Sequence, residues 1–95
     1  MVEVKQANNG VVSKLTKALV QGLKQAGIPA RVNTEPVRLT NLWRVYVIAR
    51  KFKNLRPSER QDLVWRIAGL ALTPDEQLRI SMILTVTPEE LKGNW

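Results

Sequence analysis

The sequence predicts an α+β fold in the order αββαβ, with a three-stranded sheet covered on one face by two main helices. Apolar residues recur every three or four positions over residues 12–26 and 63–71, as in amphipathic helices. Residues 42–49 and 78–86 are instead rich in β-branched residues or alternate between apolar and polar. A chain of 95 residues can build one modest core. We therefore expect a single domain over residues 1–95, with an ordered core from about residue 9 to 91 and flexible termini.

The first helix is expected to begin just after Asn8 and Asn9, with its apolar stripe running from Val12 to Ala26. Asn8 and Asn9 precede it and favour the N-cap position, where a side-chain oxygen accepts from a free backbone N–H. Gly27 supplies the left-handed position that ends many helices and Pro29 cannot continue one, so the helix should end near Ala26. Its buried stripe comprises Val12, Leu15, Leu19, Leu23 and Ala26, and its outer face comprises Lys14, Lys17, Gln21 and Lys24.

Three segments are expected to form strands. Ala30 to Thr34 is short and is followed by Glu35 and Pro36, which suits a strand near a sheet edge. Leu42 to Ala49 is rich in β-branched and aromatic residues and is expected to be the strongest strand. The last strand alternates a buried set, Leu78, Ile80, Met82, Leu84 and Val86, with a mostly wet set, Arg79, Ser81, Ile83 and Thr85. The strand order stays open, because a crossover permits a parallel pair and the first two strands could form a hairpin.

The second helix is expected to begin at Pro57, a residue accepted in a first helical turn. Its apolar face comprises Leu63, Val64, Ile67, Ala68 and Ala71. Two later segments, Thr73-Pro74-Asp75-Glu76 and Thr87-Pro88-Glu89-Glu90, have the form of capping boxes that start short helices. Capping accounts for these acidic pairs better than hydrolysis or metal binding does.

The composition argues against an enzyme. The chain has no Cys and no His, which removes thiolate and imidazole ligands, cysteine nucleophiles and the commonest general base near neutral pH. We expect no catalytic residues and no metal site. Residues 1–9 do not have the pattern of a signal peptide, and the longest apolar run is too short to cross a bilayer. The sequence therefore favours a cytoplasmic protein that does not bind membranes.

Positive charge is concentrated in the first two thirds of the chain. The net charge is +7, with 13 Lys and Arg against 4 acids in residues 1–66 but 2 against 4 in residues 67–95. Such an excess attracts phosphate backbones or acidic protein surfaces, and it also keeps a small protein soluble. The strongest candidates for nucleic-acid binding lie where the main strand passes into the second helix: Arg50, Lys51, Lys53, Arg56, Arg60 and Arg66. A solvated loop explains the same residues about as well.

Other motifs favour structural roles. Trp43, Tyr46 and Trp65 could stack on an unpaired base if they were exposed, but rings in so small a domain are mostly needed in the core. The lysines of the first helix are typical of any surface helix. KH domains hold nucleic-acid backbone with a Gly-x-x-Gly loop, which this sequence lacks. Gly69 stands alone in an apolar helix, where a packing contact is the expected reason for it.

Residues 43–91 combine a strand that runs into a Lys-Phe pair, an Arg before a Leu-Val-Trp triplet, and a last strand that leads into Thr-Pro-Glu-Glu. These features are Lys51-Phe52, Arg60 with Leu63-Val64-Trp65, Leu78 to Thr85, and Thr87-Pro88-Glu89-Glu90. Together they resemble the BolA family. The resemblance covers roughly the carboxyl-terminal half of the chain. It implies a fold related to the type II KH domain and regulatory, interaction-based roles without catalysis.

The same resemblance draws attention to missing ligands. Members of the family commonly pair with monothiol glutaredoxins and share an iron–sulfur cluster through a His in the last strand and a His or Cys in the first strand-to-strand loop. Here the last-strand position is Arg79, which has no lone pair for a metal, and Glu35 to Asn41 contains neither His nor Cys. The family's Arg-His pair in the helix becomes Arg60-Gln61. We therefore expect no iron–sulfur cluster and no other cofactor.

Two functions follow as hypotheses. The first is a basic, non-enzymatic regulatory module that binds RNA or DNA through the strand-to-helix loop. The second is a protein–protein adaptor that binds an acidic or complementary surface through the exposed sheet face, the basic helix or an edge strand, without nucleic acid. In either case we expect a monomer or a weak dimer.

Overall fold

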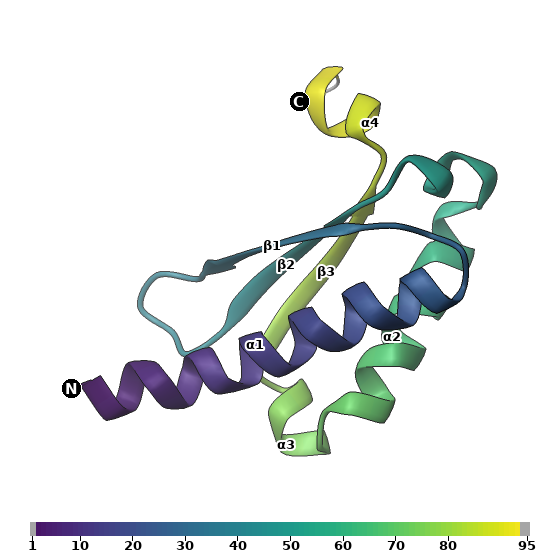
Figure 1. The fold of residues 1–95 in the computed structure, drawn as a ribbon. Coiled ribbons are helices and arrows are strands. Elements are labelled where there is room, and N and C mark those ends of the chain that lie inside the picture. Colours follow the sequence, from purple (N-terminus) through teal and green to yellow (C-terminus); the bar gives the residue numbers. More distant parts are fainter. Residues whose placement is uncertain (1, 94–95) are drawn as a thin grey trace.

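The computed structural model describes the backbone of residues 2–93 and the side chains of residues 10–92. Three strands and two long helices form its body (Figure 1). In chain order the elements are α1 (Val2–Gln25), β1 (Arg31–Pro36), β2 (Trp43–Ile48), the 3₁₀ helix η1 (Arg50–Asn54), α2 (Pro57–Ala71), α3 (Pro74–Gln77), β3 (Ile80–Val86) and α4 (Pro88–Gly93). The predicted α+β class is confirmed, and the expected order of the main elements is observed. The flexible termini predicted outside residues 9–91 stay a prediction, and residues 1, 94 and 95 lie outside the described residues.

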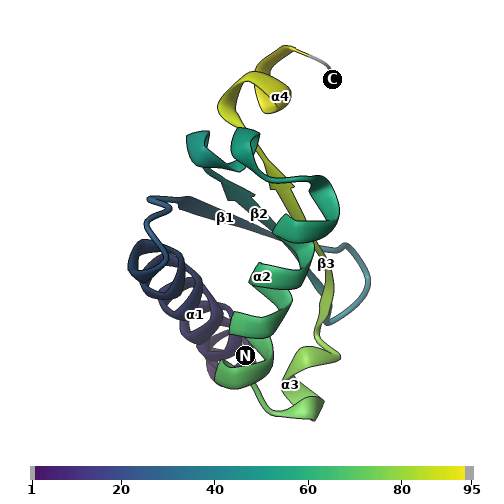
Figure 2. The same ribbon diagram turned by 90° about the vertical axis from the view of Figure 1, so that its right-hand side faces the viewer.

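The strands form one mixed sheet in the order β1-β2-β3. β1 and β2 are an antiparallel hairpin, and β2 and β3 are parallel and joined by a crossover through α2. Both connections that the sequence left open therefore occur, and β1 lies at an edge as predicted. Figure 2 shows α1 and α2 on the same face of the sheet. Of the helices within residues 2–93, neither long one lies on the opposite face, and α4 lies at one end of that face (Figure 1).

The core fills the space between the sheet and the two helices. Leu15, Leu19 and Leu23 of α1 are fully buried there, as the periodicity predicts, in the same core cluster as Val45 and Val47 of β2. Both predicted capping boxes are present: Thr73 Oγ1 accepts from Glu76 N at 3.1 Å, and Thr87 Oγ1 accepts from Glu90 N at 3.1 Å. Gly27 has φ +80°, so the left-handed end predicted for α1 is confirmed as well.

The predicted start of α1 is wrong. Asn8 and Asn9 do not cap the helix but lie inside it, because α1 begins at Val2. An N-cap residue favours a helix start without enforcing one, and Asn in a helix interior costs under about 0.7 kcal/mol relative to Ala. Residues 2–9 contain neither Gly nor Pro, so nothing in the chain breaks the helix there. Ala26, assigned to the buried stripe, lies past the last residue of α1 and is exposed.

The predicted faces of β3 are wrong in its central part. The register passes from Trp43 opposite Ile80 to Arg44 opposite Met82, so Ser81 is one extra residue in β3. A bulge of this kind reverses the alternation of side chains beyond it. Ile83 therefore enters the core, 4% exposed, whereas Met82 is 38% exposed on the opposite face. Leu78 is not in the strand at all, since it caps α3 and is 75% exposed.

The expectation of a packing contact at Gly69 is also wrong. Gly69 is exposed, and a Cβ built there would meet nothing within 4 Å. The close contact between the helices lies at Gly22, where a Cβ would come 2.9 Å from Ile67 Cδ1. Gly22 of α1 thus lets α2 approach closely, a role that its position inside a helical pattern did not reveal.

Within the part of the chain that the structure describes, no helix is both long and apolar enough to cross a membrane.

Candidate functional site

Four of the six predicted binding residues lie together in one short segment, which we call the basic loop: residues 50–56, between β2 and α2. Arg50, Lys51 and Lys53 belong to η1, and Arg56 is the residue before α2. All four side chains are exposed. The ion pairs within residues 10–92 join Lys14 to Glu76, Arg44 to Glu35 and Arg60 to Glu90, so none of them involves the basic loop. The four side chains of the loop therefore make no ion pair with a described carboxylate, although Glu59 Oε1 accepts from the backbone N–H of Arg56 at 2.8 Å.

The basic loop is anchored by its own apolar residues. Phe52 is fully buried, and Leu55 is half-buried against the core. Two backbone hydrogen bonds between residues three apart form the turns of the segment. Phe52 N donates to Ala49 O at 3.2 Å, and Leu55 N donates to Phe52 O at 3.0 Å. Because Phe52 points inward, the cations on either side of it are directed outward. Phe52 and Leu55 therefore hold the loop against the body of the domain.

Arg60, expected among the exposed binding residues, is buried. It is 5% exposed, and its Nε donates to Phe52 O at 2.8 Å and to Leu55 O at 3.2 Å. Its guanidinium also lies 5.6 Å from the centroid of the Phe52 ring. Arg60 is therefore not placed to bind phosphate, and instead it holds the backbone of the basic loop. Arginine is suited to this task because its planar group can donate in several directions at once.

The remaining donors of Arg60 reach the other end of the chain. Nη1 donates to Thr85 O at 3.3 Å and to Glu90 Oε1 at 2.9 Å. The same Glu90 oxygen accepts from Thr87 N at 2.9 Å as part of the α4 capping box. The hydrogen bond from Arg60, and then that from Thr87, lower the pKa of Glu90 below its usual value of 4.5. One buried guanidinium thus ties together the basic loop, β3 and α4.

Arg66 is exposed but lies apart from the basic loop. It is ten residues beyond Arg56, which on a helix rising 1.5 Å per residue places it roughly 15 Å along the axis of α2. The six predicted residues are therefore divided by the structure into a compact group of four, one buried positioning residue and one separate cation.

The aromatic residues divide between the core and the open face of the sheet. Trp43 and Trp65 are half-buried against the core, in agreement with the structural role predicted for them. Tyr46 instead lies on the open face, where its hydroxyl donates to Glu35 Oε1 at 3.0 Å beside Arg44 Nη1 at 3.2 Å. These two contacts lower the pKa of Glu35 and keep its carboxylate ionised.

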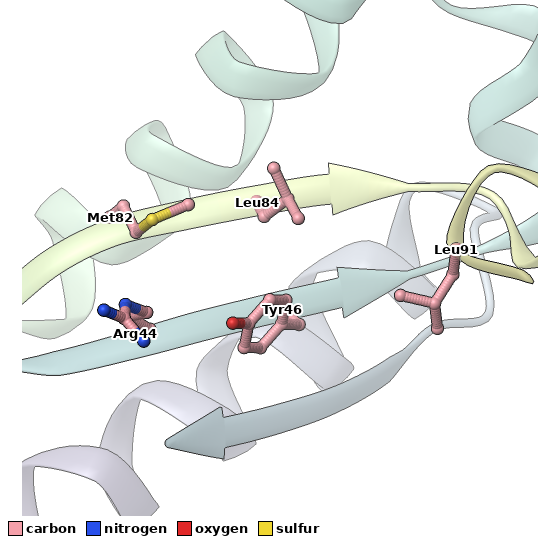
Figure 3. Close-up of a pocket in the computed structure, with 5 residues that line it drawn as sticks. All are labelled: Arg44, Tyr46, Met82, Leu84 and Leu91. Carbon is pink, nitrogen blue, oxygen red and sulfur yellow. The ribbon is translucent and has the colours of Figure 1, made fainter. Parts of the chain in front are cut away.

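The open face carries a shallow apolar hollow of about 500 Å³, where the sequence predicts only an exposed sheet face. Figure 3 shows the residues that line it, which are Arg44, Tyr46, Met82, Leu84 and Leu91. The bulge at Ser81 puts Met82 and Leu84 on this side, and the start of α4 places Leu91 at one end. The hollow is the second place where a partner could bind.

The positions that the BolA resemblance singles out serve the fold here. Arg79 takes part through its backbone, since its carbonyl O accepts from Trp43 N at 2.8 Å at the start of the β2–β3 pairing. Gln61 Nε2 donates to Ile83 O at 2.7 Å, and Gln61 Oε1 accepts from Trp65 Nε1 at 3.1 Å. Among the described residues there is no group of three or more potential metal ligands.

Comparison with known proteins gave no assignment: no family model matches the chain, and neither the curated proteins nor the solved structures contain a match.

Proposed function

We propose that this protein is a small, non-enzymatic regulatory module of the cytoplasm that binds the backbone of single-stranded nucleic acid through the basic loop. We further propose that it is a divergent relative of the BolA and type II KH folds. One observation carries the functional proposal: Arg50, Lys51, Lys53 and Arg56 are exposed on an anchored segment and pair with no described acid.

The basic loop differs from an ordinary solvent-exposed segment of charged residues because its backbone is anchored to the core. A mobile lysine loop would lose conformational entropy on binding, which weakens association. Here Phe52 and the hydrogen bonds from Arg60 already fix the backbone, so that part of the cost is met when the domain folds. Arginine and lysine contacts to phosphate are independent of base identity. We therefore expect salt-sensitive binding with weak sequence selectivity.

The proposed mode differs from that of a KH domain, which brings backbone close to phosphate through glycines. The basic loop has no glycine, and its contacts would come from side chains. Stacking on aromatic residues is not part of the proposal, since the ring within the loop, Phe52, is fully buried.

The test is the salt dependence of binding to a fluorescent single-stranded RNA or DNA about 12 nucleotides long. Replacing Lys51 and Lys53 by Gln should weaken binding and lower the slope of log affinity against log salt by about 0.7 for each phosphate that the variant no longer neutralises. The matched control replaces Lys17 and Lys24, which are exposed on α1, and removes the same net charge. Equal slopes for both double variants and the wild type would contradict the proposal.

A protein–protein adaptor is the alternative, and the apolar hollow on the open face favours it. Met82 is 38% exposed there, next to the half-buried Leu84 and Leu91. Replacing Met82 by Glu should abolish binding of a protein partner while leaving nucleic-acid affinity unchanged. Partner capture from nuclease-treated extract, sensitive to Met82 but not to Lys51 and Lys53, would favour this function over the first.

A further inference from the structure

The outer edge of β1 has free backbone groups whose direction can be worked out from the sheet. Trp43 N donates to Arg79 O and Ala49 N donates to Val86 O, so the odd-numbered residues of β2 direct their backbone groups toward β3. The even-numbered residues of β2 therefore face β1, because successive residues in a strand face opposite edges.

The register then shows which groups of β1 are left over. Arg31, Asn33 and Glu35 stand opposite the even-numbered residues of β2 and hydrogen-bond with them. The N–H and C=O groups of Val32 and Thr34 consequently point away from the sheet. No other backbone segment within the described residues donates to or accepts from these two residues. They form a short, unpaired edge of the type that proteins usually protect.

The other edge of the sheet is protected. On β3, Ile83 O accepts from Gln61 Nε2 at 2.7 Å, and Thr85 O accepts from Arg60 Nη1 at 3.3 Å. Side chains of α2 thus occupy the carbonyl groups that an added strand would need. The contrast leaves β1 as the edge at which the sheet can be extended.

We propose that β1 pairs antiparallel with β1 of a second copy of this chain, about a two-fold axis at Asn33, to form a continuous six-stranded sheet. In this register Val32 of each copy faces Thr34 of the other, and the two residues exchange both hydrogen bonds. The pair is self-complementary, as a two-fold interface requires.

Charge selects this register over its neighbours. With Asn33 opposite Asn33, Arg31 of each copy lies opposite Glu35 of the other, which gives two symmetric pairs of opposite charge. A shift by two residues in one direction places Arg31 opposite Asn33, and in the other direction it places Val32 opposite Pro36, which has no N–H to donate. The Glu35 carboxylate is already ionised beside Arg44 and can accept from a further guanidinium.

The helix beside this edge allows the approach. Gly22 and Ala18 of α1 face α2. On the other flank, about 120–160° around the helix, lie Thr16 and Val20, both uncharged and half-buried. No charged side chain lies at these two positions, and the exposed Lys17 and Lys24 lie further round the helix. The buried area is small, so we expect weak association, with a dissociation constant on the order of 0.1 mM.

A cysteine at the two-fold axis tests the register. Asn33 would be a non-hydrogen-bonded pair with its symmetry mate, in which Cα atoms lie about 4.5 Å apart, within the range that a disulfide spans. Asn33→Cys should therefore form a covalent dimer under mild oxidation, and the chain has no other Cys to compete. Asn41→Cys, exposed in the loop between β1 and β2, is the matched control and should form much less. Equal or slower dimer formation by the Asn33→Cys variant would overturn the proposal.

Exchanging the charges provides a second test, by sedimentation equilibrium up to about 1 mM protein. Arg31→Glu and Glu35→Arg should each weaken self-association by roughly tenfold, because both cross-strand pairs become repulsive. An equimolar mixture of the two variants should associate at least as strongly as the wild type, since opposite charges then face each other again. Thermal melts confirm that each variant is folded. A wild type that stays monomeric, or a mixture that associates no better than its components, would overturn the proposal.

Discussion

Replacing Arg60 by Met removes the guanidinium that holds the basic loop while keeping much of the side chain's bulk. Thr85 O and Leu55 O would lose their donor from this side chain, and Glu90 would lose its ion pair. Phe52 O would retain the bond from Leu55 N. A buried acceptor left without a donor costs about 1–3 kcal/mol, and the apolar Met offsets part of that loss. We expect Arg60→Met to lower the free energy of unfolding by about 2–3 kcal/mol.

This loss is measurable without abolishing the fold. A domain of this size has a total stability of about 5–14 kcal/mol, so the variant should remain folded in buffer. In urea, with a slope of about 1 kcal/mol/M, the unfolding midpoint should fall by roughly 2–3 M. Arg66→Met, at an exposed position of the same helix, is the control and should change stability by less than about 0.5 kcal/mol. Equal midpoints for the two variants would refute the positioning role of Arg60.

The same variant distinguishes positioning from direct contact. If Arg60 only orders the basic loop, its replacement weakens nucleic-acid binding but leaves the slope of log affinity against log salt unchanged, because the number of neutralised phosphates stays the same. If Arg60 touched phosphate, the slope would fall by about 0.7. A lower slope would therefore contradict the buried placement of this side chain.

Further predictions concern stability, measured by thermal or urea unfolding. Gly69→Ala should raise the free energy of unfolding by about 0.5–1 kcal/mol, since the position is exposed in a helix. The Gly22→Ala variant should be less stable than the Gly69→Ala variant by about 1 kcal/mol or more, because Ile67 must move to make room for the added methyl group. Equal stabilities of the two variants would contradict the close packing at Gly22. Leu39 has φ 65° and is 98% exposed, so Leu39→Asn should stabilise by about 0.5–1 kcal/mol, whereas a decrease in stability would show that the side chain makes a contact. Because Arg60 and Thr87 lower the pKa of Glu90, the folded state binds fewer protons than the unfolded state once the pH falls below about 5. The free energy of unfolding should therefore decrease from about pH 5 down to the pKa of Glu90 in the folded state. Glu90→Gln should reduce this dependence on acid pH, and an unchanged dependence would contradict the role of the Arg60 and Thr87 contacts.

Local signals in the sequence were sufficient to predict most of the fold. The apolar spacing of α1 and α2, the left-handed Gly27 and both capping boxes each depend on interactions within a few residues, and the structure confirms them. The faces of β3 could not be predicted in the same way. They depend on one inserted residue, Ser81, whose effect is visible only once β3 is paired with β2.

Arg60 shows a different limit of prediction. It stands four residues before Val64 and eight before Ala68, on the buried stripe of α2, so periodicity alone indicates burial. The positive charge favoured the opposite interpretation, because an arginine is rarely buried without partners. Its partners, Phe52 O, Thr85 O and Glu90, come from three separate segments and meet only in the folded chain. The cation cluster was visible in the sequence, but its anchoring was not.

The measurement that bears most directly on the proposed function is chemical-shift mapping of ¹⁵N-labelled protein with short single-stranded RNA and DNA at low and high salt. We predict changes concentrated at Arg50 to Arg56 that shrink as salt rises, with little change on the open face around Met82 and Leu84. Changes centred on that face, or none at either salt concentration, would contradict nucleic-acid binding by the basic loop.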